Sequence, residues 1–439
     1  MSRQLFAGWG GTAGSWADAA APAHTDELAR LLTSGDGYVI ARGLGRSYGD
    51  AAQSAGGLVV SVAALNAVAG WERDDRVITC GAGVTLLDLI NAAVPRGLFI
   101  PVSPGTAMVT VGGAIAADVH GKNHHNAGSF GDHVRSLRLM TADGVVHRLE
   151  RGSREFAATI GGMGLTGIIL EADIEMLPIV GNVMSVTTVR TRDLDDTLTQ
   201  LASADAARYS VAWLDVLAQG TAFGRGIVTS GDHAETARSG RGGLLQRPKL
   251  SAPRHLPSGL LNRHTVSAFN AGWYHRAPRL REGERQSIRE FFHPLDSIAQ
   301  WNRVYGRSGF VQYQFVVPDV STEVLRVILR RFAADSVASF LTVLKRFGPG
   351  NDSPLSFPIA GWTLAIDIPT KTPGLARTLV WVDEQVAAAG GRVYLAKDSR
   401  MYPETVRAMY PRIAEFLEVR EQMDPDGRFA SDLARRLRI

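Results

Sequence analysis

The pattern of hydrophobic and polar residues changes character near residue 180. Before that point, helical periodicity predicts two short helices, at 25–34 with Thr25 as its cap and at 86–97. Asp143-Gly144 between two apolar runs predicts a β-hairpin over 135–150. Other short apolar runs, bounded by turn residues, predict strands at 38–43, 57–62, 75–83 and 161–179.

After residue 180, longer segments with clear strand or helix periodicity replace the glycine loops. Alternating apolar and polar residues predict a half-buried strand at 183–191. Further strands are predicted at 310–318, 339–348 and 361–369. Helices are predicted at 321–335, at 375–391 and over most of the chain from residue 394. These elements form no strict βαβ series.

One segment, 231–264, lacks either periodicity and is predicted to be a mobile loop. It combines leucine pairs at 244–245 and 260–261 with the basic residues Arg238, Arg241, Arg247, Lys249, Arg254 and Arg263. Such a loop could rest on an anionic membrane, or it could be an ordinary solvated loop.

Composition narrows the class of protein. The 439 residues are 45% hydrophobic and 21% charged, as expected for a globular protein of two or three domains. The net charge of +4 is too small to argue for a nucleic-acid partner. A lone cysteine, Cys80, excludes disulfides within the chain. We expect no signal peptide and no transmembrane helix, because no sufficiently long apolar run is present.

Two glycine-rich loops are the first candidates for chemistry. Residues 42–50 (RGLGRSYGD) have glycine at alternate positions, so that backbone N–H groups can converge on phosphate oxygens. The second loop, residues 104–106 and 110–116, contains the pair Gly112-Gly113, which permits close approach to a flat or anionic ligand. Plain turns and tight strand packing are the alternatives. No G-x-G-x-x-G opens a helix, so a nucleotide is expected to be held by loops.

The block His120-Gly121-Lys122-Asn123-His124-His125, followed by His133, is the second candidate. Imidazoles bind zinc, but this spacing matches no common metal motif and no H-E-x-x-H accompanies it. A substrate or cofactor site and a structural role remain the alternatives.

Lysine is rare in this chain: only five of the 47 basic residues are Lys. Lys397, in YLAKDSR, could stabilise a reduced cofactor or, with a lowered pKa, accept a hydroxyl proton. A surface pair between Lys397 and Asp398 is the ordinary alternative.

Together these blocks resemble the vanillyl-alcohol-oxidase-type flavoproteins, and within them the oxidases of polyprenylphosphoryl-ribose. The resemblance runs through ARGLGRSYGDAAQ, PGTAMVTVGGAIAADVHGKNHHNAGSFGDHVRS, NRVYGRSGFVQYQFVVP, KRFGPGN, PLSFPIAGW and AKDSR. It covers nearly the whole chain and is weakest at 180–265. It implies a two-domain α+β flavoprotein: an FAD-binding domain of residues 1–180 and 392–439, and a substrate-binding domain of residues 181–391 with an antiparallel sheet.

The resemblance also implies a cofactor site. FAD is expected to rest on Ala41, Arg42, Gly43, Leu44, Gly45, Arg46, Ser47, Tyr48, Gly49, Asp50, Ala51, Gly105, Thr110, Val111, Gly112, Gly113, His120, Ile169 and Tyr394. Relatives that bind flavin covalently carry His where this chain has Arg46, so FAD is expected to be non-covalent. No metal is expected.

The resemblance implies a substrate pocket and a reaction as well. Lys397, His120 and Tyr48 are the expected catalytic residues, and the substrate is expected to contact Lys122, Gln312, Gln314, Lys345, Asp367 and Lys397. The expected reaction oxidises the 2′-hydroxyl of polyprenylphosphoryl-β-D-ribose to a ketone. A partner NAD(P)H-dependent keto-reductase would then complete epimerisation to the arabinose donor for cell-wall arabinan. Thr363 and Ala365 stand where the family pattern has Asn and Cys.

The resemblance leaves two other functions open. An alditol or aldonolactone oxidase that acts on a free polyol would use the same fold, and a non-enzymatic flavin- or metal-binding protein is the third hypothesis. For the epimerase oxidase, a peripheral position at the cytoplasmic or periplasmic membrane face is expected.

Overall fold

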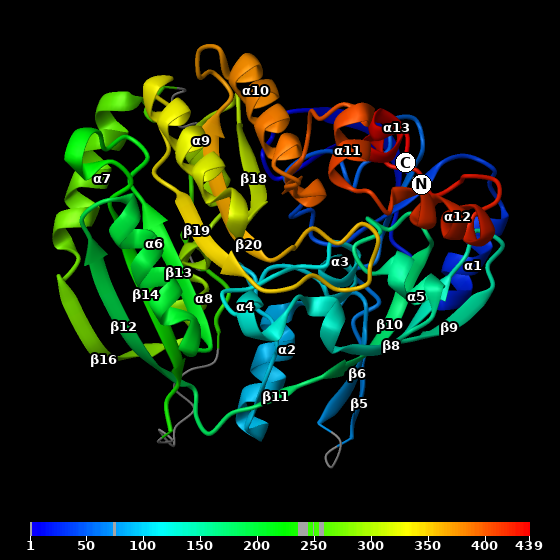
Figure 1. Ribbon diagram of the computed structural model, residues 1–439. Coiled ribbons are helices and arrows are strands. Elements are labelled where there is room, and N and C mark those ends of the chain that lie inside the picture. Colours follow the sequence, from blue (N-terminus) through cyan, green and yellow to red (C-terminus); the bar gives the residue numbers. More distant parts are fainter. Residues whose placement is uncertain (1, 73–75, 236–244, 249, 254–258) are drawn as a thin grey trace.

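The computed structural model describes residues 2–72, 76–235, 245–248, 250–253 and 259–439 (Figure 1). Its first 180 residues form two small sheets and the two-stranded pair of β7 (Leu98–Phe99) and β11 (Leu177–Pro178), with short helices between them. The elements are β1 (Ser2–Ala7), β2 (Gly14–Ala20), α1 (Thr25–Thr33), β3 (Val39–Arg42), β4 (Leu58–Ser61), β5 (Val68–Glu72), β6 (Val77–Gly81), α2 (Leu86–Ala93), β7 (Leu98–Phe99), α3 (Val111–Ala116), α4 (His124–Ala127), β8 (Val134–Met140), β9 (Val146–Glu150), α5 (Arg154–Thr159), β10 (Ile168–Glu175) and β11 (Leu177–Pro178).

The strand order explains where the first glycine loop lies. Strands β1-β2-β4-β3 form one sheet, in which β4 is parallel to both β2 and β3. The connection from β3 to β4 is the loop that contains residues 43–57, so this loop leaves the end of β3 and must cross back before β4 begins. Strands β5-β6-β10-β8-β9 form a second, antiparallel sheet. Its core includes Ile78, Leu137 and Ile174, and in β10 the buried Ala172 and Ile174 alternate with half-buried residues.

The rest of the chain builds one large sheet. Its elements are β12 (Val183–Thr191), α6 (Leu194–Ser203), β13 (Tyr209–Leu214), β14 (Gly226–His233), β15 (Leu250–Ser251), α7 (Arg263–Arg276), β16 (Leu280–Ser287), α8 (Ile288–Phe292), β17 (Ile298–Ala299), β18 (Phe310–Pro318), α9 (Thr322–Ala334), β19 (Thr342–Phe347), β20 (Gly361–Pro369), α10 (Leu375–Ala388), β21 (Arg392–Val393), α11 (Pro403–Met409), α12 (Ile413–Met423) and α13 (Asp432–Leu437).

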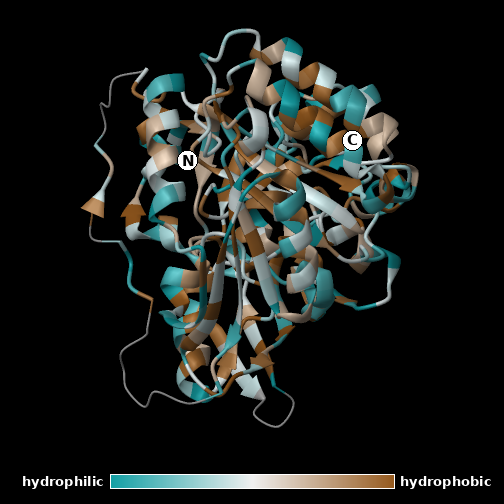
Figure 2. Ribbon diagram, turned by 60° about the vertical axis from the view of Figure 1, so that its left-hand side comes forward, coloured by the Kyte–Doolittle hydropathy of each residue, from teal (hydrophilic) through white to brown (hydrophobic). Residues whose placement is uncertain are grey.

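Eight strands pair in the order β16-β12-β14-β13-β19-β20-β18-β21. Helices α6, α9 and α10 cover one face of this sheet (Figure 1). Figure 2 shows hydrophobic positions gathered on the strands inside the molecule, while the outer helices carry many hydrophilic ones. The predicted antiparallel sheet of the α+β fold is therefore confirmed.

Residue alternation in β18 separates the two faces of the sheet. Tyr313 points to the helices, where its hydroxyl donates to Asp383 in α10 at 2.7 Å. Gln312 and Gln314 point to the opposite face, beside their β20 partners Asp367 and Ala365. The uncovered face of the sheet thus presents polar side chains, and the functional site lies against it.

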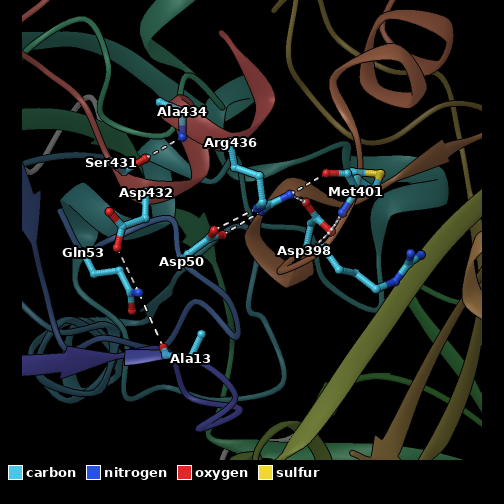
Figure 3. Close-up of polar contacts among 10 residues, drawn as sticks. Ala13, Asp50, Gln53, Asp398, Met401, Ser431, Asp432, Ala434 and Arg436 are labelled. Carbon is cyan, nitrogen blue, oxygen red and sulfur yellow. Dashed lines mark hydrogen bonds and ion pairs between the residues drawn. The ribbon is translucent and has the colours of Figure 1, made fainter. Parts of the chain in front are cut away.

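The C-terminal segment ties the two halves together. β21 is the last strand of the large sheet and pairs with β18, whereas α13 packs near the loop after β3. The Arg436 guanidinium bonds both carboxylate oxygens of Asp50, at 2.7 and 2.9 Å, and Asp398 Oδ2 at 2.8 Å (Figure 3). It also donates to the Met401 carbonyl. These charges raise the pKa of Arg436, although burial opposes the shift.

Most predicted elements are confirmed, with two local corrections. Helix α1 is capped by His24, not Thr25, and His24 makes no side-chain capping bond. The segment 231–264 is not wholly a loop, because β14 extends to His233, β15 pairs with β17, and α7 begins at Arg263. Its residues Arg238, Arg241, Lys249 and Arg254 lie outside the described part of the chain, as do 15 of the 34 residues in the segment predicted as a mobile loop. No helix in the described ranges is long and apolar enough to cross a membrane.

Replacing Arg436 by Met would leave the Asp50 and Asp398 carboxylates close together without a counter-charge. Their side chains are 13% and 2% exposed, so the free energy of unfolding should fall. A loss of about 3–5 kcal/mol is expected in urea denaturation.

The matched control is Arg192→Met, which breaks a pair with Asp196 at a side chain that is 82% exposed. It should cost less than about 1 kcal/mol. Equal losses in the two variants would show that the Arg436 bonds contribute no more than a surface ion pair.

Candidate active site

A cavity of about 1450 Å³ lies between the uncovered face of the large sheet and the glycine loops. One wall comes from β12, β13, β14, β18, β19 and β20, the other from residues 41–52, 103–122 and 163–169, and residues 394–397 close one side. Its volume exceeds the range of roughly 300–1,000 Å³ that is usual for a single small-molecule site. The cavity therefore has room for a large cofactor together with a substrate.

The two glycine loops meet at Gly43 and Thr110. A Cβ on Gly43 would lie 2.3 Å from Thr110 Oγ1, so only glycine permits this contact. Thr110 Oγ1 cannot easily move, because it caps α3 by accepting from Gly113 N at 3.2 Å. Gly45 adopts a left-handed φ of 64°. The loops thus bring backbone N–H groups to the cavity wall, a surface that suits the phosphates of a dinucleotide.

Arg42 and Arg46 have different tasks in this loop. The Arg42 side chain turns away from the cavity and donates to the carbonyls of Ala52 and Ala7, at 2.7 and 2.8 Å. Arg46 lines the cavity, and its guanidinium lies 4.1 Å from the centre of the Trp9 ring. The position where covalent relatives have His is therefore filled by an arginine stacked on an indole.

Three of the five lysines share this cavity. Lys122 Nζ donates to the Phe291 carbonyl and lies 4.1 Å from the Phe291 ring centre. Burial lowers the pKa of Lys122 to about 7, aided by repulsion from Lys345, and burial lowers that of Lys345 to about 8. Cations gathered in a poorly solvated cavity repel one another, and an anionic ligand would relieve that repulsion.

Lys397 lies at the side of the cavity near the loop of Tyr48. Its Nζ is 3.8 Å from the centre of the Tyr48 ring, and Tyr48 N donates to the Ala396 carbonyl at 2.9 Å. Burial lowers the pKa of Lys397, while the carboxylate of Asp367 opposes this shift. An amine held in this state can lose its proton near neutral pH, which an exposed lysine does not do.

Asp367 stands behind Gln312 rather than in the cavity wall. Its Oδ1 accepts from Gln312 Nε2 at 2.5 Å and its Oδ2 accepts from the Tyr305 hydroxyl at 3.2 Å. Burial raises the pKa of Asp367, and its bonds to Gln312 and the charge of Lys397 partly offset this. Asp367 thus orients Gln312 and acts electrostatically on Lys397.

His120 is a neutral ring at the centre of the site. Gln314 Nε2 lies 2.8 Å from His120 Nε2, and because an amide nitrogen only donates, the histidine proton must be on Nδ1. Burial, then the charge of Lys345, lowers the pKa of His120 well below its ordinary value. His120 Nδ1 has no partner among the described residues. An unpaired buried donor at a cavity wall fits a site completed by a ligand.

Asp118 fixes the backbone that leads to His120, and sequence analysis missed it. The buried carboxylate accepts from Ser129 Oγ, Gly131 N, Asn351 Nδ2 and Ser356 Oγ at 2.6–2.9 Å. Burial raises the pKa of Asp118, and these bonds oppose the shift. The available signal was an acidic residue that interrupts the run of small residues in AIAADVHG.

Most predicted site residues lie together in the cavity wall. These are Ala41, Gly43, Leu44, Gly45, Arg46, Ser47, Tyr48, Ala51, Gly105, Thr110, Gly112, Gly113, His120, Lys122, Ile169, Gln312, Gln314, Lys345, Tyr394 and Lys397. Five lie behind that wall: Arg42, Gly49, Asp50, Val111 and Asp367. Gly49 and Asp50 instead contact the segment of Asp398 and Arg436. Ala365 also lines the cavity, while Thr363 holds Gln314 at 3.2 Å.

The histidine block does not gather around one point. His124 is buried against the Phe347 ring, His125 bonds the Ala207 carbonyl and His133 bonds that of Ala127. Across the described ranges, no three His, Cys, Asp or Glu side chains are grouped as metal ligands. Of this block, only His120, Gly121 and Lys122 line the cavity.

Comparison with known proteins agrees with this geometry. Residues 17–150 match the FAD binding domain family, and residues 321–437 match the D-arabinono-1,4-lactone oxidase family. The chain is 44% identical to decaprenylphosphoryl-β-D-ribose oxidase of Mycolicibacterium smegmatis, over 98% of this chain and 97% of that protein. This chain belongs to that oxidase family. It is therefore an FAD-dependent oxidoreductase of the vanillyl-alcohol-oxidase type, as its sequence predicts.

Two other relatives differ widely in their sequence identity to this chain. An uncharacterised protein of Streptomyces coelicolor is 42% identical over 81% of this chain and 100% of its own length. Alditol oxidase of a Streptomyces species is 24% identical over 95% of this chain. The polyol-oxidase alternative thus rests on a much more distant similarity.

Gly43→Ala tests whether the contact between the two loops holds the cofactor. Its Cβ would push Thr110 away and separate the two loops, so the purified protein should lose most of its flavin absorbance. Gly37→Ala is the control, because its Cβ would meet nothing within 4 Å. Normal flavin content in Gly43→Ala would show that the loop contact is not needed for binding.

Proposed function

We propose that this protein oxidises the 2′-hydroxyl of a polyprenylphosphoryl-β-D-ribose to the 2′-keto sugar. The observation that carries the proposal is the convergence of Lys122, Lys345 and Lys397 on one poorly solvated cavity beside the glycine loops. A phosphodiester carries a negative charge that can neutralise the ammonium groups of these lysines, whereas a free polyol carries none. The name of the mycobacterial relative points to the same substrate.

FAD, when bound, supplies the acceptor for the hydride that leaves C2′ of the sugar. Lys397 Nζ accepts the proton of the 2′-hydroxyl, because burial favours its neutral amine. The resulting ammonium would be stabilised by Asp367, and its positive charge would partly neutralise negative charge on the reduced cofactor. Tyr48 holds Lys397 in place through its ring.

The other polar residues bind and orient the sugar phosphate. Lys122 and Lys345 bind the phosphodiester as point charges. His120 donates from Nδ1, its unpaired atom, and its ring is held by Gln314 on one side. Gln312, fixed by Asp367, offers its remaining amide positions to the sugar. The aromatic rings of Phe347, Phe357 and Tyr394 surround His120 and exclude water from it.

Three further features belong to this proposal. FAD is bound non-covalently, since Arg46 cannot form the bond that His forms in covalent relatives. A partner NAD(P)H-dependent keto-reductase reduces the ketone to the arabinose epimer, which serves as a donor for cell-wall arabinan. The protein acts at a membrane surface as a peripheral protein, because its substrate is a lipid.

Anaerobic titration of the flavin tests the reaction directly. Polyprenylphosphoryl-ribose should bleach the absorbance of the oxidised flavin, while free ribose and xylitol should not, because they lack the phosphate that the lysines bind. Bleaching by free polyols alone would replace the proposal with an alditol oxidase. A yellow protein that no sugar bleaches would refute the proposed reaction.

Lys397→Met should keep the flavin but slow its reduction by the saturating substrate about 10²–10⁴-fold. In the wild-type protein, the limiting rate should rise with pH and then level off, because only the neutral amine accepts the proton. The midpoint should lie well below the ordinary lysine pKa of about 10.4. Stopped-flow absorbance measures both effects. If the rise with pH persists in Lys397→Met, another group must accept the proton.

A further inference from the structure

Helix α7 is fastened to the edge of the cavity by polar contacts on one face. The buried Asn270 donates to Asp215 Oδ1 at 3.0 Å and to the Ser339 carbonyl at 3.2 Å. One turn later, the Tyr274 hydroxyl donates to the Thr191 carbonyl at 3.1 Å. These contacts, four residues apart, fix which face of the helix turns outward.

The other face of α7 carries a pair of aromatic rings at the cavity wall. Phe269 and Trp273 are also four residues apart, and their rings stack at 6.3 Å with an interplanar angle of 9°. They are 51% and 48% exposed, and both line the cavity that contains Lys397. Large exposed apolar side chains at the mouth of a cavity typically mark a binding surface.

An apolar wall continues inward from this pair. The rings of Phe269 and Phe340 are nearly perpendicular, with centres 5.9 Å apart, and Trp213 and Val343 also line the cavity. Trp213 Nε1 donates to the Phe340 carbonyl at 2.9 Å, so its polar atom is already satisfied. This wall ends at Lys345, two residues after Val343 on the same face of β19. The cavity thus has an aromatic entrance and a cationic interior.

We propose that Phe269 and Trp273 bind the isoprenoid chain of the lipid-linked substrate where it leaves the cavity. This inference rests on the function proposed above and adds a subsite to it. The lysines hold the phosphodiester, and the chain attached to it must leave along a wall without unpaired polar groups. The wall from Val343 to α7 meets that requirement, and flat rings fit the methyl-branched, polar-free isoprene units.

The test compares substrates that differ only in chain length, both dissolved in detergent. In Phe269→Ala/Trp273→Ala, KM for decaprenylphosphoryl-ribose should rise about tenfold or more, because contacts with the chain are lost. KM for geranylphosphoryl-ribose should change less than about twofold, since two isoprene units offer the pair much less apolar surface than ten. The limiting rate of flavin reduction should stay the same for both.

Two single variants serve as controls. Trp273→Phe keeps an aromatic ring and should retain most of the preference for the long chain. Trp16→Ala removes a tryptophan of similar exposure, 54%, that does not line the cavity, and should leave both KM values unchanged. Unchanged flavin content and thermal unfolding would show that the double variant is folded.

The possible outcomes separate the two proposals. If the wild-type protein is bleached by neither lipid, the proposed function fails and the subsite fails with it. If the wild-type protein is bleached but the double variant has the same KM ratio for the two chain lengths, the subsite alone is refuted. Loss of binding to phosphatidylglycerol vesicles, with that ratio unchanged, would assign the rings to the membrane and would also overturn the proposal.

Discussion

The site depends on a half-buried cation that holds two carboxylates from distant parts of the chain. Arg436 joins Asp50, which follows the first glycine loop, to Asp398, which follows Lys397 (Figure 3). The two loops approach so closely that a Cβ on Gly49 would overlap the Asp398 carbonyl. Two like charges at this spacing would repel each other without the guanidinium between them. One ion-pair network therefore holds the first glycine loop close to the segment that contains Lys397.

Asp118, a buried carboxylate, likewise holds together segments that are distant in the sequence. Asp118 gathers donors from its own loop and from Asn351 and Ser356, which follow β19. The loop that leads to His120 and the segment after β19 are thus both fixed to the Asp118 carboxylate. Rigid positioning by shared polar groups suits a site in which the hydroxyl, its base and the cofactor must meet in one geometry.

Local patterns in the sequence predicted the elements well, because the alternation in β12 and the periodicity of α9 and α10 reflect one buried face each. The resemblance then supplied the positions that line the cavity, such as Lys345 and Gln314. The identity of a single residue does not show whether its side chain faces the cavity or the opposite side of the backbone. Asp367 and Asp50 looked like ligand contacts, yet one supports Gln312 and the other pairs with Arg436. Long-range partners of this kind leave no local signal.

The Arg436 network has a consequence for the synthesis of the protein. Asp50 and Arg436 are 386 residues apart along the chain. At about 5–20 residues per second, a ribosome needs roughly 20–80 s to make the residues between them. During this interval the glycine loop has no counter-charge for Asp50 and no partner for Gly49. The glycine loop can therefore reach this arrangement only after Arg436 has been synthesised, when every strand of the described sheets has already been translated.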